Sequence, residues 1–368
     1  MEKGNILKEI LNKVENKTSK LYFFTMDTKG NPTAGIANIY EHVKVLNENG
    51  FNATILHEKS DYTTVESWLG KDYSSLPHVC IENQVSINPE DFLVIPEIFS
   101  NIMHDLRKYS CKKIVFSQNY HYILELLAPG AKWSDYGFDE VITTSSQQAD
   151  YINTLFTSVN TNVIPVAIPN YFKPSDKPRK PIIGILTRDQ GDALKIAKSF
   201  YLKYPIFKWV SFKEFRGLSR ENFAEELKEC CVAVWVDDVA GFGTFPLEAI
   251  ECNVPVIAKV PNMVQEWMGK KVLNKDTEQE SWSLNNNFLW TRDYLDIPTL
   301  ISQFMNLWLT DDLPQNLLDN IENSKGQYSP EKQKEELLKV YGTIFNKREN
   351  ELKEIILRED NNQPSLQK

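Results

Sequence analysis

Hydrophobic residues in the first 166 positions gather into short runs separated by segments of helical periodicity. The runs that predict strands are "LYFFT" (21–25), "FNATIL" (51–56), "FLVI" (92–95), "KKIVF" (112–116), "EVITT" (140–144) and "NVIPV" (162–166). Between the first two runs, apolar residues from Ile36 to Leu46 recur at helical spacing, and Gly50 ends the predicted helix. Strands that alternate with helices build parallel sheets, so this region predicts an α/β domain.

The same alternation resumes after a proline-rich stretch. Five prolines fall between positions 165 and 181, and proline breaks helices and cannot donate a ladder hydrogen bond, so the stretch predicts an interdomain linker. Predicted strands follow at "PIIGIL" (181–186), "FKWVSF" (207–212), "CVAVWV" (231–236) and "VPVIA" (254–258), with helices at 193–204 and 219–229. The pattern predicts two Rossmann-like, doubly wound α/β domains that face each other across a cleft.

The predicted domains span 1–167 and 168–328. Helical stripes at 297–309 and 329–357 follow the last strand. We expect residues 329–368 to form a C-terminal helix that packs back toward the N-terminal domain, ending in a polar tail.

The first 20 residues predict an amphipathic helix with apolar side chains on one face and lysines on the other. Two interpretations stay open: the helix packs on its own domain, or it contacts a membrane surface. The chain contains neither a signal peptide nor an apolar run of bilayer-spanning length. We therefore expect a cytoplasmic protein whose membrane contact is at most peripheral, at the inner membrane face.

Composition and charge narrow the function classes. The chain has 368 residues, 42% of them hydrophobic, and a formal net charge of -9. An acidic protein lacks the basic footprint of nucleic-acid binders, so we expect no nucleic-acid partner. The five cysteines form no Cys-x-x-Cys pair, which predicts buried free thiols in a reducing compartment.

A glycine turn carries the strongest candidate chemistry. In "VWVDDVAGFGTFPLEAIECNVPVIA" (234–258), Gly241 and Gly243 follow a buried strand and precede a helix. Ligands of open α/β sheets bind beyond the carboxyl ends of the strands, where this turn lies. Glycines leave room for an incoming group, and the helix start directs free N–H groups toward an anion. The turn therefore predicts a phosphate site.

Two readings of Glu248 stay open. With Pro246 as the first helical residue, Glu248 occupies the third position and could cap its own helix. The alternative is a carboxylate that accepts hydrogen bonds from sugar hydroxyls beside a bound phosphate.

This stretch resembles the donor-site signature of retaining, bacterial glycosyltransferases of the GT-B fold, the "glycosyl transferases group 1" (Glu-x7-Glu) superfamily. The specific part is "GFGTFPLEAIECNVPVIA" (241–258). Weaker likeness covers most of residues 20–310, including 30–56 and the strand and linker at 163–174. The resemblance implies a nucleotide-diphosphate sugar donor, UDP- or GDP-linked, in the C-terminal domain. It also implies a glycan or glycoconjugate acceptor held mainly by the N-terminal domain.

The resemblance also implies roles for individual residues. Arg188 matches the basic residue that neutralises the diphosphate, and Glu248 matches the carboxylate that holds the ribose. Further donor contacts are implied or suggested by position for Gly241, Phe242, Gly243, Thr244, Phe245 and Lys195. The resemblance also places Arg216, Gly217 and Leu218 where the nucleotide base usually stacks. Lys195 could instead be a solvated helix lysine.

One position departs from the family pattern. Ala240 stands eight residues before Glu248, where the family carries a glutamate implied to contact the transferred sugar. Asp237 or Asp238 could reach the same space from the strand end, and we include Asp238 with Arg188 and Glu248 as catalytic candidates. The alternatives are a changed sugar preference or a lost activity.

The N-terminal domain supplies candidates for the acceptor or sugar side. Asn119 and His121 follow the strand at 112–116, and Glu97 follows the strand at 92–95. His121 could position hydroxyls or lie at the surface, and Glu97 could be a helix-start carboxylate or an acceptor contact. Gly35 opens the first helix and would allow a donor phosphate to approach closely.

The expected chemistry needs no metal and no cofactor besides the nucleotide-sugar substrate. A guanidinium and a helix start can stabilise a departing diphosphate. Asp237 and Asp238 are adjacent, so they point to opposite sides of an extended chain rather than toward one ion. The favoured hypothesis is a hexosyltransferase-type glycosyltransferase (EC 2.4) of polysaccharide biosynthesis. The alternative is a non-catalytic GT-B accessory or scaffold protein.

Overall fold

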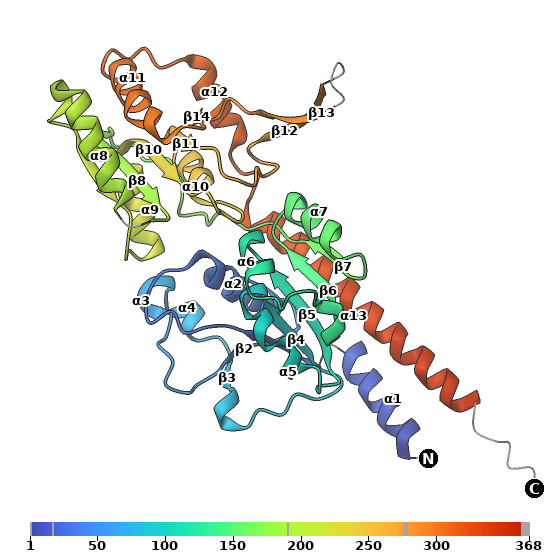
Figure 1. Ribbon diagram of the computed structural model, residues 1–368. Helices are drawn as coiled ribbons and strands as arrows, with labels where there is room; N and C mark the ends of the chain where they lie inside the picture. The colour runs from blue at the N-terminus through green and yellow to red at the C-terminus, as the bar shows by residue number, and fades with distance from the viewer. Residues whose placement is uncertain (1, 17, 190, 275–278, 362–368) are drawn as a thin grey trace, which may run out of the picture. The chain divides into compact units, whose positions relative to one another are not determined.

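The computed structural model describes residues 2–16, 18–189, 191–274 and 279–361, and Figure 1 shows their arrangement into helices and strands. The chain divides into two compact units. Unit 1 comprises Met1–Thr144, Gln148–Pro165 and Gln333–Lys368, and unit 2 comprises Ser145–Gln147 and Val166–Lys332.

Unit 1 is built on a seven-stranded parallel sheet in the order β3-β2-β1-β4-β5-β6-β7. Its strands are β1 (Lys20–Phe24), β2 (Asn52–His57), β3 (His78–Cys80), β4 (Phe92–Pro96), β5 (Lys112–Ser117), β6 (Phe138–Thr143) and β7 (Asn160–Val163). The order reverses between β1 and β4, which is the topological switch point of a doubly wound sheet. The predicted strands are present, but the last was placed too late: β7 is Asn160–Val163, whereas the prediction was 162–166. The strand β3 was not predicted, since it has only three residues.

Helices cover unit 1's sheet. They are α1 (Glu2–Glu15), α2 (Ala34–Glu48), α3 (Glu66–Leu69), α4 (Lys71–Ser74), α5 (Met103–Leu106), α6 (Tyr120–Glu125), α7 (Ser146–Leu155) and α13 (Pro330–Asn361), with short 3₁₀ turns η1 (Ile81–Asn83), η2 (Glu97–Ile102) and η3 (Trp133–Tyr136). The apolar face of α1 is turned into the unit: Ile10 and Val14 are buried in its core, with Leu7 and Leu11 packed beside them. The contact of this face is therefore with its own unit, the first of the two interpretations.

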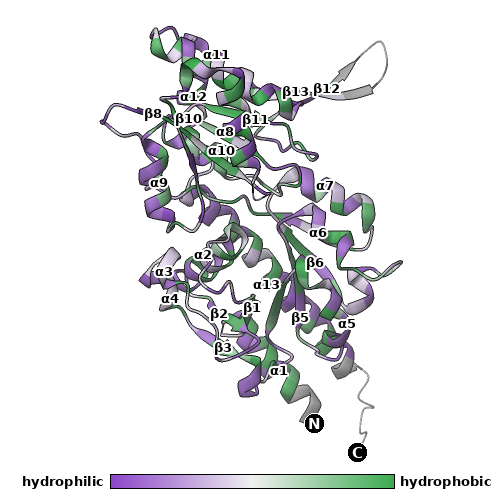
Figure 2. Ribbon diagram, turned by 60° about the vertical axis from the view of Figure 1, so that its left-hand side comes forward, coloured by the Kyte–Doolittle hydropathy of each residue, from purple (hydrophilic) through white to green (hydrophobic). Residues whose placement is uncertain are grey.

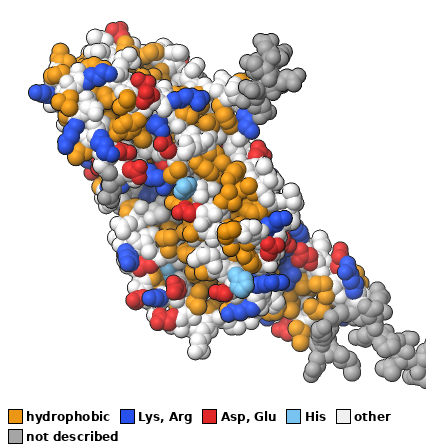
Figure 3. Space-filling model, in the orientation of Figure 1, with side chains coloured by type: hydrophobic (Ala, Val, Ile, Leu, Met, Phe, Trp, Pro, Cys, Tyr) orange, Lys and Arg blue, Asp and Glu red, His pale blue; other side chains and the backbone are white. Residues whose placement is uncertain are grey.

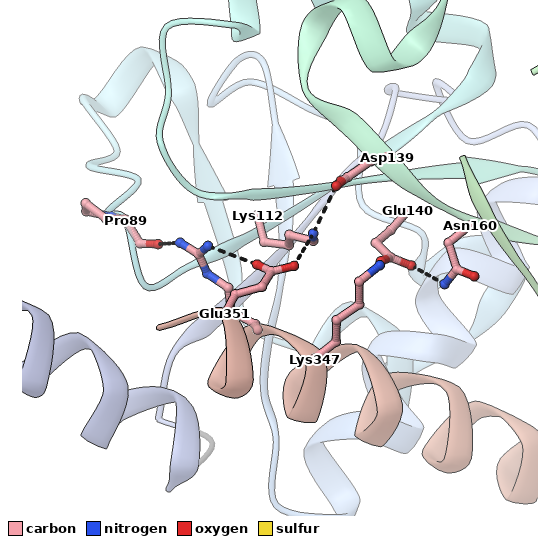
Figure 4. Close-up of polar contacts among 8 residues, drawn as sticks. Pro89, Lys112, Asp139, Glu140, Asn160, Lys347 and Glu351 are labelled. Carbon is pink, nitrogen blue, oxygen red and sulfur yellow. Dashed lines mark hydrogen bonds and ion pairs between the residues drawn. The ribbon is translucent and has the colours of Figure 1, made fainter. Parts of the chain in front are cut away.

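The long helix α13 packs on the same core through Leu337, Tyr341, Ile344 and Phe345. Polar contacts also hold the C-terminal half of α13 against unit 1, as Figure 4 shows. Lys347 pairs with Glu140, whose carboxylate is fully buried and also accepts a hydrogen bond from Asn160 (2.7 Å).

A second buried charge stands nearby in Figure 4. Lys112 is 7% exposed and donates to Asp139 (3.3 Å) and to Glu351 of α13 (3.2 Å). Buried charges are tolerated when they are paired, so these contacts specify where α13 lies on unit 1.

Unit 2 is built on a five-stranded parallel sheet in the order β14-β11-β10-β8-β9, with a separate antiparallel hairpin. Its strands are β8 (Lys180–Thr187), β9 (Ser211–Glu214), β10 (Cys230–Val236), β11 (Val256–Lys259), β12 (Gly269–Asn274), β13 (Gln279–Leu284) and β14 (Leu289–Thr291). The switch point falls between β8 and β10. The hairpin and β14 were not predicted, because their sequences are polar and interrupted.

Five helices and two 3₁₀ turns complete unit 2: α8 (Asp192–Lys203), η4 (Pro205–Phe207), α9 (Arg220–Lys228), α10 (Phe245–Glu251), η5 (Tyr294–Asp296), α11 (Ile297–Leu309) and α12 (Gln315–Ser324). The strand predicted at 207–212 was placed too early. Pro205 starts a 3₁₀ turn through Phe207, and the ladder begins at Ser211.

Hydrophobic residues concentrate on the strands of both sheets in Figure 2, in keeping with parallel sheets covered on both faces. The predicted α/β class with two doubly wound sheets is confirmed. Of the helices in the described ranges, none combines the length and hydrophobicity needed to cross a bilayer.

Candidate functional site

The switch point of unit 2 is bridged by an ion pair. Arg188 directly follows β8 and Asp237 directly follows β10, the two strands at which the winding reverses. The Arg188 guanidinium donates from Nε and Nη2 to the two carboxylate oxygens of Asp237, at 2.6 and 3.1 Å. The Arg188 side chain stays 37% exposed. A guanidinium thus stands where doubly wound sheets bind their ligands.

Arg216 braces the same strand end. Its Nη2 donates to the carbonyl oxygens of Thr187 (3.2 Å) and Asp189 (3.4 Å), the residues on either side of Arg188. The Arg216 Nε pairs with Glu214. The sequence assigned Arg216 to a nucleotide base, whereas the structure gives it hydrogen bonds that hold the Arg188 segment.

The neighbours of Arg216 have different surroundings. Gly217 has a φ of +67°, and a Cβ there would meet nothing within 4 Å. Leu218 is half-buried against the core of unit 2. Of the three predicted base contacts, Arg216 and Gly217 are exposed and Leu218 is half-buried.

Glu248 is buried and faces a second arginine. Helix α10 begins at Phe245, so Pro246 is the second helical residue rather than the first, and Glu248 is the fourth rather than the third. Arg220, the first residue of α9, donates from Nη2 to Glu248 Oε1 at 3.3 Å. Burial raises the pKa of Glu248, while the charge of Arg220 and hydrogen bonds from Arg220 and Thr244 act in the opposite direction.

Both the backbone conformation and the packing at position 243 require glycine. Its φ is +78°, and a Cβ would lie 2.9 Å from Cζ2 of Trp235 and 3.3 Å from Cζ2 of Trp267. Trp267 also donates from Nε1 to the carbonyl oxygen of Phe242 (2.8 Å). The two indoles thus shape the turn. Gly241, by contrast, is not among the described glycines with positive φ.

The aromatic residues of the turn belong to the core. Phe242 is 5% exposed and packs edge-on against Tyr328, and Phe245 is 3% exposed beside Phe223. Ala240 is also buried, at 2% exposure, in the same cluster. Gly241, Gly243 and Thr244 are half-buried, and the position of the family's glutamate is filled by a core methyl group.

Two further candidates are occupied by surface ion pairs. Asp238 pairs with Lys259. Lys195 is 69% exposed and binds Asp192 at 2.8 Å, one turn back on α8. Lys195 is thus a solvated helix lysine, one of its two open interpretations.

The switch point of unit 1 carries Glu97, which directly follows β4. Its carboxylate is 2% exposed and accepts a hydrogen bond from the backbone N–H of Asn119 (2.7 Å) at the start of α6. Burial raises the pKa of Glu97 to about 7, against the backbone hydrogen bonds, which lower it. Asn119 caps α6 by accepting from the N–H of His121, and the exposed His121 ring lies 3.6 Å from Glu125. Glu97 thus accepts a hydrogen bond at the start of α6, and its contact with an acceptor stays a prediction.

Gly35 is half-buried and lies against a neighbouring amide side chain. The Gln118 side chain donates to the carbonyl oxygen of Gly35 (3.1 Å), and a Cβ at Gly35 would lie 3.3 Å from Gln118 Nε2. Gln118 in turn accepts from Asn38 (3.0 Å), which accepts from Gln333 of α13 (3.0 Å). A chain of amides therefore covers the glycine.

The sequence missed Arg220 and the two indoles at Trp235 and Trp267. Arg220 opens "RENFAEELK" and looks like any charged residue in a first helical turn. Arg220 contacts Glu248, 28 positions away along the chain, and Trp267 lies against Gly243, 24 positions away, so local pattern carried no signal for them. Trp235 is only eight positions from Gly243, but as one apolar residue of a buried strand it looks like the rest of that strand.

The similarity of the chain to known proteins is clearest in its fold. No protein-family model matches the chain. An α-1,6-glucosyltransferase of Actinobacillus pleuropneumoniae serotype 7 (strain AP76) is 24% identical over 246 residues, covering 62% of this chain and 73% of the relative.

Solved structures match over most of the chain. A sucrose-phosphate synthase from Thermosynechococcus elongatus has a TM-score of 0.61 at 13% identity, covering 89% of this chain and 99% of its own. The pneumococcal O-GlcNAc transferase GtfA, solved with UDP and GlcNAc, has a TM-score of 0.58 at 8% identity with the same coverage. A glycosyltransferase from Rickettsia africae ESF-5 scores 0.55 at 12% identity, covering 89% and 98%. The expected likeness to GT-B glycosyltransferases is confirmed at the level of the fold.

Proposed function

We propose that the protein is a glycosyltransferase that moves a sugar from a nucleotide-diphosphate sugar to a glycan or glycoconjugate acceptor. The observation that carries the proposal is the switch point of unit 2, where Arg188 and the Gly243 turn meet at the carboxyl ends of β8 and β10. The GT-B fold of similar solved structures and the similarity to a glucosyltransferase support the same proposal.

Arg188 is the group we assign to the diphosphate. Guanidinium forks match phosphate oxygens, and the Arg188 side chain is 37% exposed whereas its partner Asp237 is 15% exposed. A bound diphosphate would share the guanidinium with Asp237. Helix α10 has only seven residues, so we give its dipole a smaller part than the arginine.

Glu248 suits a neutral hydroxyl partner. Its carboxylate is desolvated and already oriented by Arg220 and Thr244, which is how a hydrogen-bond acceptor for a ribose would be held. Backbone groups of 241–245 complete the donor site in this proposal.

The finer parts of the proposal concern mechanism. We propose retention of anomeric configuration and transfer without a metal. In support of the second, the two carboxylates after β10 are each engaged by a cation, Asp237 by Arg188 and Asp238 by Lys259. Transfer that persists in a chelator would support it, and transfer restored only by a divalent ion would contradict it.

The second candidate, a non-catalytic GT-B protein, rests on Ala240. Its buried methyl group leaves no carboxylate where the family's first glutamate would stand. This candidate predicts nucleotide binding without release of nucleotide diphosphate from any donor.

One experiment tests both candidates. The full chain is incubated with UDP-, GDP- and ADP-linked sugars, and we measure thermal stabilisation and nucleotide diphosphate release. We expect one nucleotide class to stabilise the protein and to be slowly hydrolysed. Arg188→Ala should reduce turnover by about 10²- to 10³-fold.

The matched control is Arg107→Ala, an exposed arginine of unit 1, which should leave both readouts unchanged. Stabilisation by no nucleotide or nucleotide sugar would contradict both candidates. Stabilisation without hydrolysis or transfer would favour the non-catalytic one.

A further inference from the structure

One face of unit 2 combines exposed apolar side chains with lysines. Four large apolar residues stand out on α8 and the turn that follows it: Leu194 (56% exposed), Leu202 (82%), Ile206 (77%) and Trp209 (50%). Leu194 and Leu202 are eight residues apart, so they lie on one side of α8. Clusters of such side chains on a soluble surface mark an interaction site.

The same segment is strongly basic. Between Asp192 and Glu214 the chain carries Lys195, Lys198, Lys203, Lys208 and Lys213 and not a single acidic residue, in a protein of net charge -9. Lys195, Lys198, Lys203 and Lys208 are all exposed. Figure 3 shows hydrophobic and basic side chains interspersed over the part of unit 2 that Figure 1 labels α8 and α11.

Acidic groups lie at the border of this face rather than within it. Asp192 pairs with Lys195 at the first turn of α8. Asp293 and Asp296 flank Leu295, whose neighbour Tyr294 donates to the carbonyl oxygen of Asp192 (3.2 Å). Beyond these, Lys203 donates to the Thr299 hydroxyl (2.8 Å), which fixes the end of α8 on α11.

We propose that this α8 face, defined by Leu194, Lys198, Leu202, Ile206, Lys208 and Trp209, docks on an anionic lipid bilayer. Its features match an interfacial anchor: aliphatic tips, one tryptophan at the headgroup level and lysines that reach phosphates. A protein partner fits less well, because the cores of protein interfaces are depleted in lysine, whereas here lysines alternate with the apolar residues. Long lysine side chains can keep their charge at the interface while their neighbours insert.

The face is separate from the groups assigned to the donor, so the inference does not rest on the proposed function. It also differs from the membrane contact considered for the N-terminal helix. That helix turns its apolar face into unit 1, leaving only Ile6 (55% exposed) near its start.

Sedimentation of the full chain with vesicles tests the proposal. We expect binding to phosphatidylcholine vesicles that contain phosphatidylglycerol, little binding to phosphatidylcholine alone, and weakening by high salt. Leu202→Gln/Ile206→Gln should weaken binding by about tenfold or more. Lys198→Glu/Lys208→Glu should weaken it similarly and remove most of the salt dependence. All four positions are exposed, so folding should be unaffected, which circular dichroism checks.

The matched control is Ile6→Gln/Leu357→Gln, at two exposed apolar positions of unit 1 (55% and 61%), which should bind like the unaltered protein. As a second readout, vesicles should shift tryptophan emission to the blue, and Trp209→Phe should lose that shift. Absence of binding to anionic vesicles would overturn the proposal, as would equal loss in the control pair. Self-association or capture of a protein through Leu202 and Ile206, without lipid binding, would also overturn it.

Discussion

The two units share the doubly wound sheet topology, but they carry different side chains at their topological switch points. In unit 2 the reversal between β8 and β10 is spanned by the Arg188–Asp237 ion pair. In unit 1 the reversal between β1 and β4 carries Glu97, which is held by backbone amides and whose pKa burial raises to about 7. One reversal carries an ion pair, and the other carries a network of amides and a buried carboxyl group whose pKa is raised.

This difference shows that equivalent positions in two related sheets can suit different chemistry. A guanidinium at a strand end favours an anion, and the site we assign to the diphosphate is there. Amide side chains such as Gln118 and Asn38 offer donors and acceptors without charge, which suits the hydroxyls of a sugar. Under the proposed function, unit 2 would bind the charged diphosphate of the donor.

Titratable groups are also divided unequally. All five histidines of the chain lie in unit 1, and His42, His57 and His78 have pKa values lowered mainly by burial. Unit 2 instead buries the Glu248–Arg220 pair. The two units should therefore respond differently to acid and to loss of a charge.

The largest expected effect is on unit 2. Arg220→Met removes the cation that faces buried Glu248, and an unpaired buried carboxylate costs about 3 kcal/mol. For a unit of this size the melting temperature should fall by roughly 6–12 °C, measured by calorimetry.

Arg220→Met/Glu248→Leu removes both charges and should recover most of that stability while failing to bind the donor. Unchanged melting of the single variant would mean that Glu248 is already neutral or solvated, and would weaken the contrast between the units.

The next effect is on unit 1 and depends on pH. Burial lowers the pKa of His42 from 6.5 to about 3, and neither ring nitrogen has a hydrogen-bond partner among the described residues. The unfolded chain takes up a proton below pH 6.5, but the folded chain does not until pH approaches 3. Stability is therefore complete above pH 6.5 and is lost as the pH falls, by about 2 kcal/mol at pH 5.

His42→Phe should remove the contribution of His42, because a phenyl ring fits against Phe116 and needs no proton, while the contributions of His57 and His78 remain. Hydrogen–deuterium exchange of unit 1 peptides at pH 5 and 7 measures it. His104→Phe, at a side chain that is 74% exposed, is the control and should leave the exchange rates at both pH 5 and pH 7 unchanged. Equal acid sensitivity of His42→Phe and the unaltered protein would contradict the assignment.

The smallest effect separates conformation from packing in the glycine turn. Gly217→Ala and Gly243→Ala both place a side chain at positive φ, but only the second meets a neighbour, Trp235, at 2.9 Å. We expect Gly243→Ala to cost about 1 kcal/mol more than Gly217→Ala in chemical denaturation. Equal costs would show that the indole moves aside freely.

The sequence by itself determined the alternation of strands and helices. Runs such as 92–95 and 231–236 are apolar because both faces of a parallel strand are buried, and this burial leaves a local signature. The glycine turn and the place of Arg188 after β8 were also readable, since each is a local feature at a strand end.

Short or polar elements left no such signature. The hairpin β12–β13 and the strand β14 depend on pairing rather than on apolar runs, so pattern did not reveal them. The helix start of α10 shifted by one residue, a difference that only backbone geometry fixes.

Only the tertiary structure decided which groups meet. Arg220 reaches Glu248 across 28 positions, and Gln118 covers Gly35 across 83. Ala240 lies in the core because the turn folds over Tyr328 and the indoles. Side-chain partners of this kind follow from packing between distant segments, and a linear pattern does not encode which of many arginines will face a buried carboxylate.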